Sequence, residues 1–184
     1  MAETLEVAVF GGGCFWCTEA LFERLRGVAS VMPGYAGGHT DHPTYESIST
    51  GETGHAEATR VEFDPSAITY ADLLTVFFAT HDPTSLNRQG NDVGTQYRSA
   101  IFYSTDAQKR EAEAFIADLN ASAKGGRPIV TTLEPLGAFT EAEDYHRHYY
   151  ETHADESYCR LVIDPKLAKL KERFSRLLKE KSND

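Results

Sequence analysis

The sequence predicts an α+β fold, a two-layer sandwich with a ferredoxin-like βαββαβ core and additions at the C-terminal end. Two observations predict it. Strand-like runs alternate with amphipathic helical patterns, and the first six elements follow the order β-α-β-β-α-β. The chain has 184 residues, of which 41% are hydrophobic and 25% charged, enough for one hydrophobic core. We therefore expect a single domain over residues 1–184.

The first half of the core is predicted from three strands and one helix. A strand at Glu6–Phe10 precedes three glycines, and a helix at Cys14–Leu25 follows them. Gly27 lies just past the expected end of that helix, where glycine often terminates helices. Further strands are expected at Val28–Val31 and at Ala58–Phe63, where apolar and polar residues alternate.

The second half continues with a helix whose apolar residues recur at helical spacing, namely Tyr70, Leu73, Leu74, Phe77 and Phe78. Thr69 and Asp72 resemble a capping box at its start. A strand at Ser99–Tyr103 follows, and Thr105 with Gln108 marks the start of another helix.

Two elements complete the prediction. A fifth strand is expected at Ile129–Leu133, and a final helix carries apolar residues from Leu167 to Leu177. Two connections, at about 32–55 and 81–98, are longer than loops in compact domains usually are. They are rich in Gly, Tyr and His, so we expect ordered loops that build a site.

Composition excludes several classes of partner. The net charge is −10, which argues against binding to nucleic acid or to an anionic membrane. No apolar stretch approaches the roughly 20 residues that span a bilayer, and the start MAETLEVAVF lacks the pattern of a signal peptide. We expect a cytoplasmic monomer, and in that reducing compartment we expect the three cysteines not to form structural disulfides.

Cys14 is the principal candidate for chemistry. It opens a predicted helix directly after a strand and three glycines. The free N–H groups and the dipole at a helix start favour the thiolate, so we expect the pKa of Cys14 to fall. The alternative is a buried structural cysteine in a glycine turn.

Residues beside Cys14 have two interpretations each. Phe15 and Trp16 form either an apolar wall beside the sulfur or ordinary core packing. Cys17 completes a CxxC pair, which is typical of a redox dithiol, but a small apolar filler on the inner face fits equally well.

Other candidates come from the loops. Glu57 lies where a loop meets a strand, and burial there would raise its pKa and leave a neutral acid. Asp92 lies in a glycine-bounded turn, while Tyr45 and Tyr97 offer hydroxyl donors. His146, His148 and His153 lack the spacing of a zinc site, so we expect no metal.

Several strings together resemble the peptide methionine sulfoxide reductase A family. They are GGCFWC (12–17), GYAGG (34–38), PTY (43–45), GETGHAE (51–57), HDPT (81–84), RQGNDVGTQYRSAIFY (88–103), AEDYH (142–146) and YC (158–159). The resemblance covers about residues 9–159 and leaves 160–184 as a helical tail.

The resemblance implies a peptide-methionine (S)-S-oxide reductase that repairs oxidised proteins. Cys14 then matches the nucleophile and Glu57 the acid that protonates the sulfoxide oxygen. Phe15 and Trp16 match the pocket for the S-methyl group, Tyr45 and Tyr97 match hydroxyl donors, and Asp92 matches a supporting carboxylate. Cys159 matches the recycling cysteine. The implied substrates are oxidised proteins and free methionine sulfoxide, and the implied reductant is thioredoxin with no bound cofactor.

The chain departs from the family pattern at two places. Some members carry a second recycling cysteine in a glycine-rich C-terminal tail, whereas the tail of this chain has none. In addition, Cys17 stands where many members have glycine. Cys159 is the expected resolving thiol on the motif match, with Cys17 as its rival because a CxxC pair closes without moving a tail.

Three other functions fit parts of the sequence. A thioredoxin-like oxidoreductase would use the CxxC pair but leaves the long loops unexplained. A cysteine hydrolase would pair Cys14 with a histidine such as His55. A binding module would use the aromatic residues alone.

Overall fold

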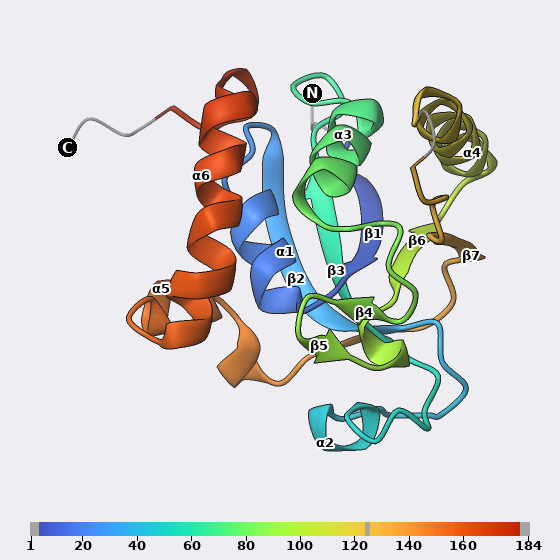
Figure 1. Cartoon of the computed structure of the whole chain (residues 1–184), viewed down its shortest axis with the longest axis vertical. Coiled ribbons are helices and arrows are strands. Elements are labelled where there is room, and N and C mark those ends of the chain that lie inside the picture. Colours follow the sequence, from blue (N-terminus) through green and yellow to red (C-terminus); the bar gives the residue numbers. More distant parts are fainter. Residues whose placement is uncertain (1–3, 124–125, 181–184) are drawn as a thin grey trace.

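The computed structural model describes residues 4–123 and 126–180, which form a mixed α+β fold around a curled six-stranded sheet (Figure 1). Its helices and strands are β1 (Glu6–Gly12), α1 (Phe15–Phe22), β2 (Val28–Ala36), α2 (Tyr45–Ile48), β3 (Ala56–Phe63), α3 (Tyr70–Thr80), β4 (Arg88–Gln89), β5 (Asp92–Val93), β6 (Ser99–Tyr103), α4 (Asp106–Ser122), β7 (Thr132–Pro135), β8 (Phe139–Glu141), α5 (Tyr149–His153) and α6 (Asp164–Arg173). The predicted α+β class is confirmed.

The sheet has the order β7-β6-β1-β3-β2-β8, with β1 and β3 at its centre. Every neighbouring pair is antiparallel except β6 with β7, which is parallel. The two glycines at the end of β1 pair with β6, because Gly12 lies opposite Ser99. This pairing holds the end of β1, from which the chain enters α1.

Successive side chains of β1 point to opposite faces of the sheet and therefore belong to two separate apolar clusters. Phe10 belongs to the larger cluster under α1, α3 and α6, whereas Val9 belongs to a smaller one on the opposite face of the sheet. The Phe10 ring stacks on Phe22 with centroids 5.2 Å apart and on Phe77 at 4.9 Å. These contacts fix α1 and α3 against β1.

Both helix starts that the sequence predicted from capping pairs carry side-chain caps. Thr69 accepts a hydrogen bond from the backbone N–H of Asp72, whose carboxylate accepts one from the N–H of Thr69. Thr105 likewise accepts from the N–H of Gln108 at the start of α4. The helix starts predicted from these pairs are confirmed.

Several boundaries differ from the sequence expectation. Helix α1 ends at Phe22 rather than Leu25, and β2 continues to Ala36 because its pairing with β3 extends that far. The strand expected at Ile129–Leu133 begins only at Thr132, where pairing with β6 starts.

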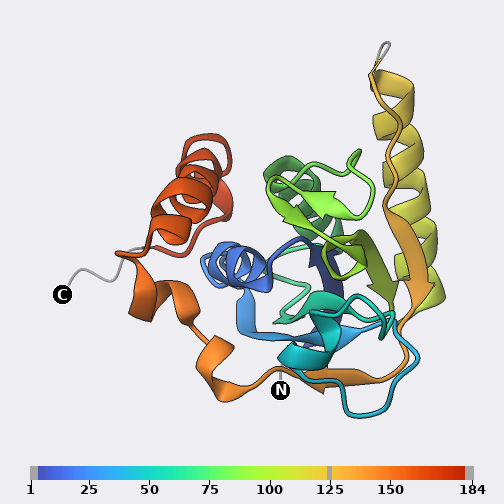
Figure 2. The same ribbon diagram turned by 60° about the horizontal axis from the view of Figure 1, so that its bottom comes forward.

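The two long connections are partly regular. The first contains the end of β2 and the short helix α2, and the second contains the β4–β5 hairpin. Figure 2 shows α2 and this hairpin on the same side of the molecule as the start of α1. Residues distant in the sequence are thereby gathered near Cys14.

The C-terminal segment packs along α1. Helix α6 lies beside α1 in both views (Figures 1 and 2), and its Leu170 is buried in the main core. A π-helical turn at Cys159–Ile163 leads into α6. None of the helices within the described residues is long and apolar enough to span a bilayer.

Candidate active site

Cys14 lies at the junction between β1 and α1. It is the N-cap residue of α1, as the sequence predicted. Its side chain is only 8% exposed, yet it forms part of the wall of a cavity of about 330 Å³. The lining residues are Cys14, Cys17, His81, Asp82, Gln89, Gly90, Asn91, Asp92, Tyr158, Val162 and Lys166.

Glycine is required immediately before Cys14. Gly13 has φ +89°, a conformation that side chains disfavour. A Cβ atom there would also lie 2.7 Å from Cγ of Gln89, which lines the cavity. The tight turn that presents Cys14 therefore depends on this residue type.

Glu57 approaches the start of α1 from β3. Its side chain is 2% exposed, and its Oε1 accepts a hydrogen bond from the backbone N–H of Phe15 at 3.2 Å. Burial raises the pKa of Glu57 to about 8, even though this hydrogen bond lowers it. The carboxyl group is therefore neutral at pH 7, in the direction that the sequence predicted.

The pKa of Cys14 is shifted upward, whereas the sequence analysis expected it to fall. Burial raises it well above its usual value, and both the hydrogen bond with Cys17 and the charge of Glu57 raise it further. The helix start acts only through a weaker backbone contact at Trp16. The sequence argument considered the helix terminus alone and left out desolvation, which has the larger effect here.

Cys17 contacts both Cys14 and a tyrosine from the C-terminal segment. Its hydrogen bond with Cys14 lowers the pKa of Cys17 to about 7, against the effect of burial. Tyr158 places its hydroxyl 3.7 Å from Sγ of Cys17 and donates a hydrogen bond to Asp92 at 2.8 Å. Tyr158 lay in the recognised string YC (158–159), but the sequence analysis assigned a role only to Cys159.

Tyr45 and Tyr97 lie in the two long connections of the chain, Tyr45 in the first and Tyr97 in the second. Tyr45 begins α2, and Tyr97 ends a 3₁₀ turn between β5 and β6. Burial raises the pKa of both hydroxyls, and the charges of Glu57 and Cys14 raise it further. Both hydroxyls are therefore protonated donors within electrostatic reach of these two groups.

The two aromatic residues after Cys14 pack differently from each other. Phe15 is fully buried against Tyr35 and His146. Trp16 is half-buried and stacks on Tyr149 with ring centroids 3.7 Å apart, while its indole N–H donates to Nδ1 of His146. Neither lines the cavity beside Cys14.

Glu143 organises the side of the site near α2. Its carboxylate accepts hydrogen bonds from the Tyr35 hydroxyl at 2.8 Å and from the backbone N–H of Tyr45 at 3.0 Å. It lay in the AEDYH string, but nothing in the sequence placed it against residues about a hundred positions earlier. Glu143 holds Tyr45 in position without lining the Cys14 cavity.

Cys159 is fully buried in a small cluster with Cys14 and Cys17. It is the first residue of the π-helical turn that leads into α6. All three cysteines carry free thiols. A π-helical turn is rare and is frequently found at functional sites, and here it carries the third thiol.

His55 is not placed as a catalytic base. Its ring hydrogen-bonds the backbone N–H of Gly38 and the carbonyl of Thr40, and so orders the loop after β2. It does not line the cavity with Cys14. His81 does line it, but both of its ring nitrogens are engaged, one by the carbonyl of Phe77 and one by the hydroxyl of Ser99. Neither histidine is therefore placed as the base of a Cys–His hydrolase.

The geometry joins a thiol to a neutral acid and two protonated hydroxyls. A sulfur nucleophile attacks a polarised centre whose oxygen can be protonated and removed. The arrangement fits reduction of a sulfur–oxygen bond better than acyl transfer, which needs an activating base beside the thiol.

The comparisons with known proteins agree with this chemistry. A family model described as peptide methionine sulfoxide reductase matches residues 6–178. Peptide methionine sulfoxide reductase MsrA of Sulfolobus acidocaldarius is 56% identical over 170 residues, covering 92% of this chain and 96% of the relative.

Two solved structures are also similar. Reduced Mxr1 from Saccharomyces cerevisiae has a TM-score of 0.77 at 34% identity and covers 84% of this chain and 89% of its own. Methionine sulfoxide reductase A of Corynebacterium diphtheriae has a TM-score of 0.73 at 38% identity, over 82% and 76% of the two chains.

Proposed function

The chain belongs to the peptide methionine sulfoxide reductase family, and on this premise we propose that it reduces methionine S-sulfoxide to methionine with Cys14 as the nucleophile. Its substrates are oxidised proteins and free methionine sulfoxide. One observation carries the assignment of roles. Cys14 lines a cavity, and the adjoining N–H of Phe15 binds Glu57, whose pKa is raised to about 8.

These residues alone account for every atom and proton transferred in the reductive step. Glu57 donates its proton to the sulfoxide oxygen as the Cys14 sulfur attacks the sulfoxide sulfur. The oxygen passes to Cys14, which becomes a sulfenic acid, and methionine leaves as a thioether. The proton of the Cys14 thiol returns Glu57 to its neutral form. No bound metal, flavin or nucleotide is needed.

The remaining side chains position the substrate. Tyr45 and Tyr97 donate hydrogen bonds to the sulfoxide oxygen, and their raised pKa values keep these protons in place. Trp16 holds the S-methyl group, whereas the fully buried Phe15 packs behind it and does not contact the substrate, contrary to the sequence expectation. Asp92 accepts a hydrogen bond from Tyr158 and supports the polar wall of the cavity.

Resolution requires a second thiol. Cys159 attacks the Cys14 sulfenic acid, releases water and forms a disulfide. Cys17 remains its rival, and one contact favours Cys17, since it already hydrogen-bonds Cys14. Cys159 is fully buried in the cluster that also contains Cys14 and Cys17.

A dithiol partner then reduces the disulfide by exchange. Thioredoxin is the proposed partner. Yeast Mxr1, the protein of one similar structure, has also been crystallised in complex with Trx2. Recovery of activity with thioredoxin, its reductase and NADPH, but not without thioredoxin, is the expected result.

The proposal is tested by stoichiometric turnover on each sulfoxide epimer of a methionine peptide. Without reductant, the S epimer should yield about one methionine per enzyme, and the R epimer almost none. Equal reaction of both epimers, or a Cys14→Ser protein that still forms methionine, would disprove the assignment.

Mass mapping separates the two candidate resolving thiols. After one turnover without reductant, peptides linked through Cys14 and Cys159 are expected. A Cys14–Cys17 disulfide that forms normally in Cys159→Ser, together with full thioredoxin-dependent turnover, would reassign the role to Cys17.

We further propose a single catalytic domain over residues 1–184, with a family core at about 9–159 and a helical tail at 160–184. The order β6-β1-β3-β2 supports the ferredoxin-like description of the two-layer core. A cytoplasmic monomer is proposed from the acidic net charge and the reactive cysteines.

A further inference from the structure

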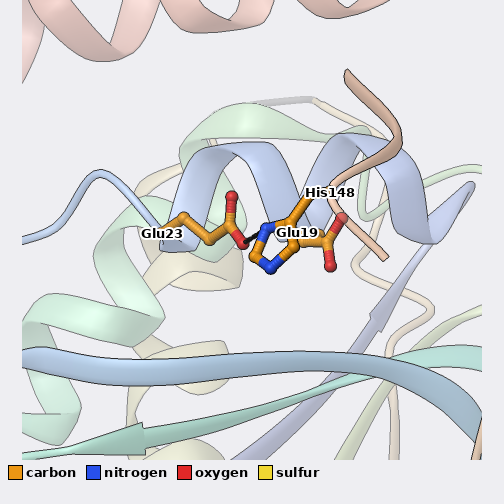
Figure 3. Close-up of side chains that lie close together, drawn as sticks. All are labelled: Glu19, Glu23 and His148. Carbon is orange, nitrogen blue, oxygen red and sulfur yellow. Dashed lines mark ion pairs between the residues drawn. The ribbon is translucent and has the colours of Figure 1, made fainter. Parts of the chain in front are cut away.

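A second group of ionisable side chains lies on α1, apart from the cavity beside Cys14. Glu19 and Glu23 are one helical turn apart, and His148 approaches them from the segment just before α5 (Figure 3). One donor atom from each residue lies within 4.8 Å of the other two. His148 and Glu23 already form a pair, with Nδ1 2.6 Å from Oε1.

Glu19 provides an independent indication that a ligand belongs here. Its side chain is 1% exposed. Its Oε2 is fully buried and has no hydrogen-bond partner among residues 4–123 and 126–180. Figure 3 shows this carboxylate beside the ring of His148. A buried carboxylate oxygen without a partner costs free energy that a bound cation would recover.

The charges around Glu19 point the same way. The carboxylates of Glu19 and Glu23 lie close to each other and to His148. Backbone N–H groups of His148 and Tyr149 donate to Glu19, and Arg24 is paired with Glu151. Within the described residues, neither of the two carboxylates forms a salt bridge with Arg24 or Arg147.

We propose that Glu19, Glu23 and His148 bind a divalent transition-metal ion, best matched by zinc. Zinc commonly takes three nitrogen or oxygen ligands from the protein and one water. The two carboxylates balance its charge, and the imidazole favours it over calcium or magnesium.

The residues around the proposed metal site show how an ion would enter and what its binding would stabilise. Glu23 and His148 line a surface hollow of about 630 Å³, through which an ion enters. Bound there, the ion ties the segment before α5 to α1. Tyr149 follows His148 directly and stacks on Trp16, so the ion stabilises that side of the site without touching Cys14.

The sequence argument missed this site for a specific reason. It considered His146, His148 and His153 and found no familiar spacing of zinc ligands. Two of the ligands are instead glutamates on a helix far away in the chain. The folded structure brings His148 to them, with a left-handed backbone at φ +52°.

The test is zinc titration of chelator-treated protein, followed by calorimetry and thermal melting. One equivalent should bind, and the melting temperature should rise with zinc concentration. His148→Ala and Glu23→Gln should weaken binding at least tenfold. The matched controls are His153→Ala and Glu151→Gln, which lie nearby but outside the ligand set and should bind as the wild type does.

Cobalt distinguishes this site from the cysteines, because thiolates also bind zinc. Cobalt bound by carboxylates and imidazole lacks the intense near-ultraviolet band of a cobalt–thiolate bond. A strong thiolate band at one equivalent, or equal affinity in wild type and His148→Ala, would overturn the proposal.

Glu19→Gln provides a variant that should fold, since it keeps the shape and removes the buried charge. It should lose zinc affinity while its metal-free form becomes at least as stable as the wild type at pH 8. If Glu19→Gln instead binds zinc as tightly as the wild type, the buried carboxylate is not a ligand and the proposal is wrong.

Discussion

Replacement of Glu57 by Gln should slow sulfoxide reduction and stabilise the protein at the same time. Gln keeps the shape of the side chain and retains an oxygen to accept the Phe15 N–H. It removes the transferable proton, so single-turnover reduction should fall by about 10²–10⁴-fold, the usual contribution of a positioned acid.

The stability effect follows from the raised pKa. An unfolded Glu57 ionises near 4.5, whereas the folded side chain holds its proton up to about 8. Within this window the folded state binds one more proton than the unfolded state, so this group makes stability fall as pH rises. The slope is about 1.4 kcal/mol per pH unit, which gives about 3 kcal/mol at pH 7 as an upper value.

Urea denaturation of wild type and Glu57→Gln at pH 5, 6, 7 and 8 measures this difference. The variant should gain on the wild type as pH rises, and the gain should level off above about pH 8. Glu52→Gln is the control, because Glu52 is exposed in the preceding loop. A difference that stays constant from pH 5 to 8 would show that Glu57 is already ionised in the folded protein.

Four further outcomes test the same site. Cys14→Ser should abolish methionine formation in stoichiometric assays, because it removes the proposed nucleophile; methionine formed by Cys17, which lines the same cavity, would contradict that role. Cys159→Ser should still form about one methionine per enzyme but lose most thioredoxin-dependent turnover in a coupled NADPH assay. Cys17→Ser should retain that turnover. If Cys17→Ser loses the turnover and Cys159→Ser keeps it, Cys17 is the resolving thiol. Tyr158→Phe removes a hydrogen bond that lowers the pKa of Cys17, so the midpoint of iodoacetamide labelling at Cys17, followed by mass spectrometry, should move upward from about pH 7. Gly13→Ala should destabilise the fold by about 1–3 kcal/mol in urea denaturation, since φ is +89° and the new Cβ meets Gln89; an unchanged midpoint would contradict the need for glycine there.

Local signals predicted much of the fold. The Thr69–Asp72 pair located the start of α3 because a capping box uses only neighbouring residues. Ser99–Tyr103 was predicted with its observed bounds because a buried strand has a distinctive run of apolar residues. Strand β8 was missed, since three residues paired with β2 carry no periodicity of their own.

In the candidate site, too, local features were predicted from the sequence and long-range contacts were not. The N-cap position of Cys14 and the raised pKa of Glu57 follow from neighbours in the chain and from general burial arguments. The pKa of Cys14 was predicted in the wrong direction, because desolvation depends on packing by distant segments. The contact between Cys17 and Tyr158 joins residues that no local pattern relates.

The hydrogen bond from the Phe15 N–H to Glu57 has a consequence for the end of the chemical step. Once Glu57 has given up its proton, its new negative charge faces the first amide of α1, where the helix presents its positive end. The helix therefore stabilises the conjugate base of the acid more directly than it activates the sulfur. A helix start that was expected to activate the attacking thiol instead makes the proton of Glu57 easier to release, and it stabilises the carboxylate until the proton of the Cys14 thiol restores the neutral form.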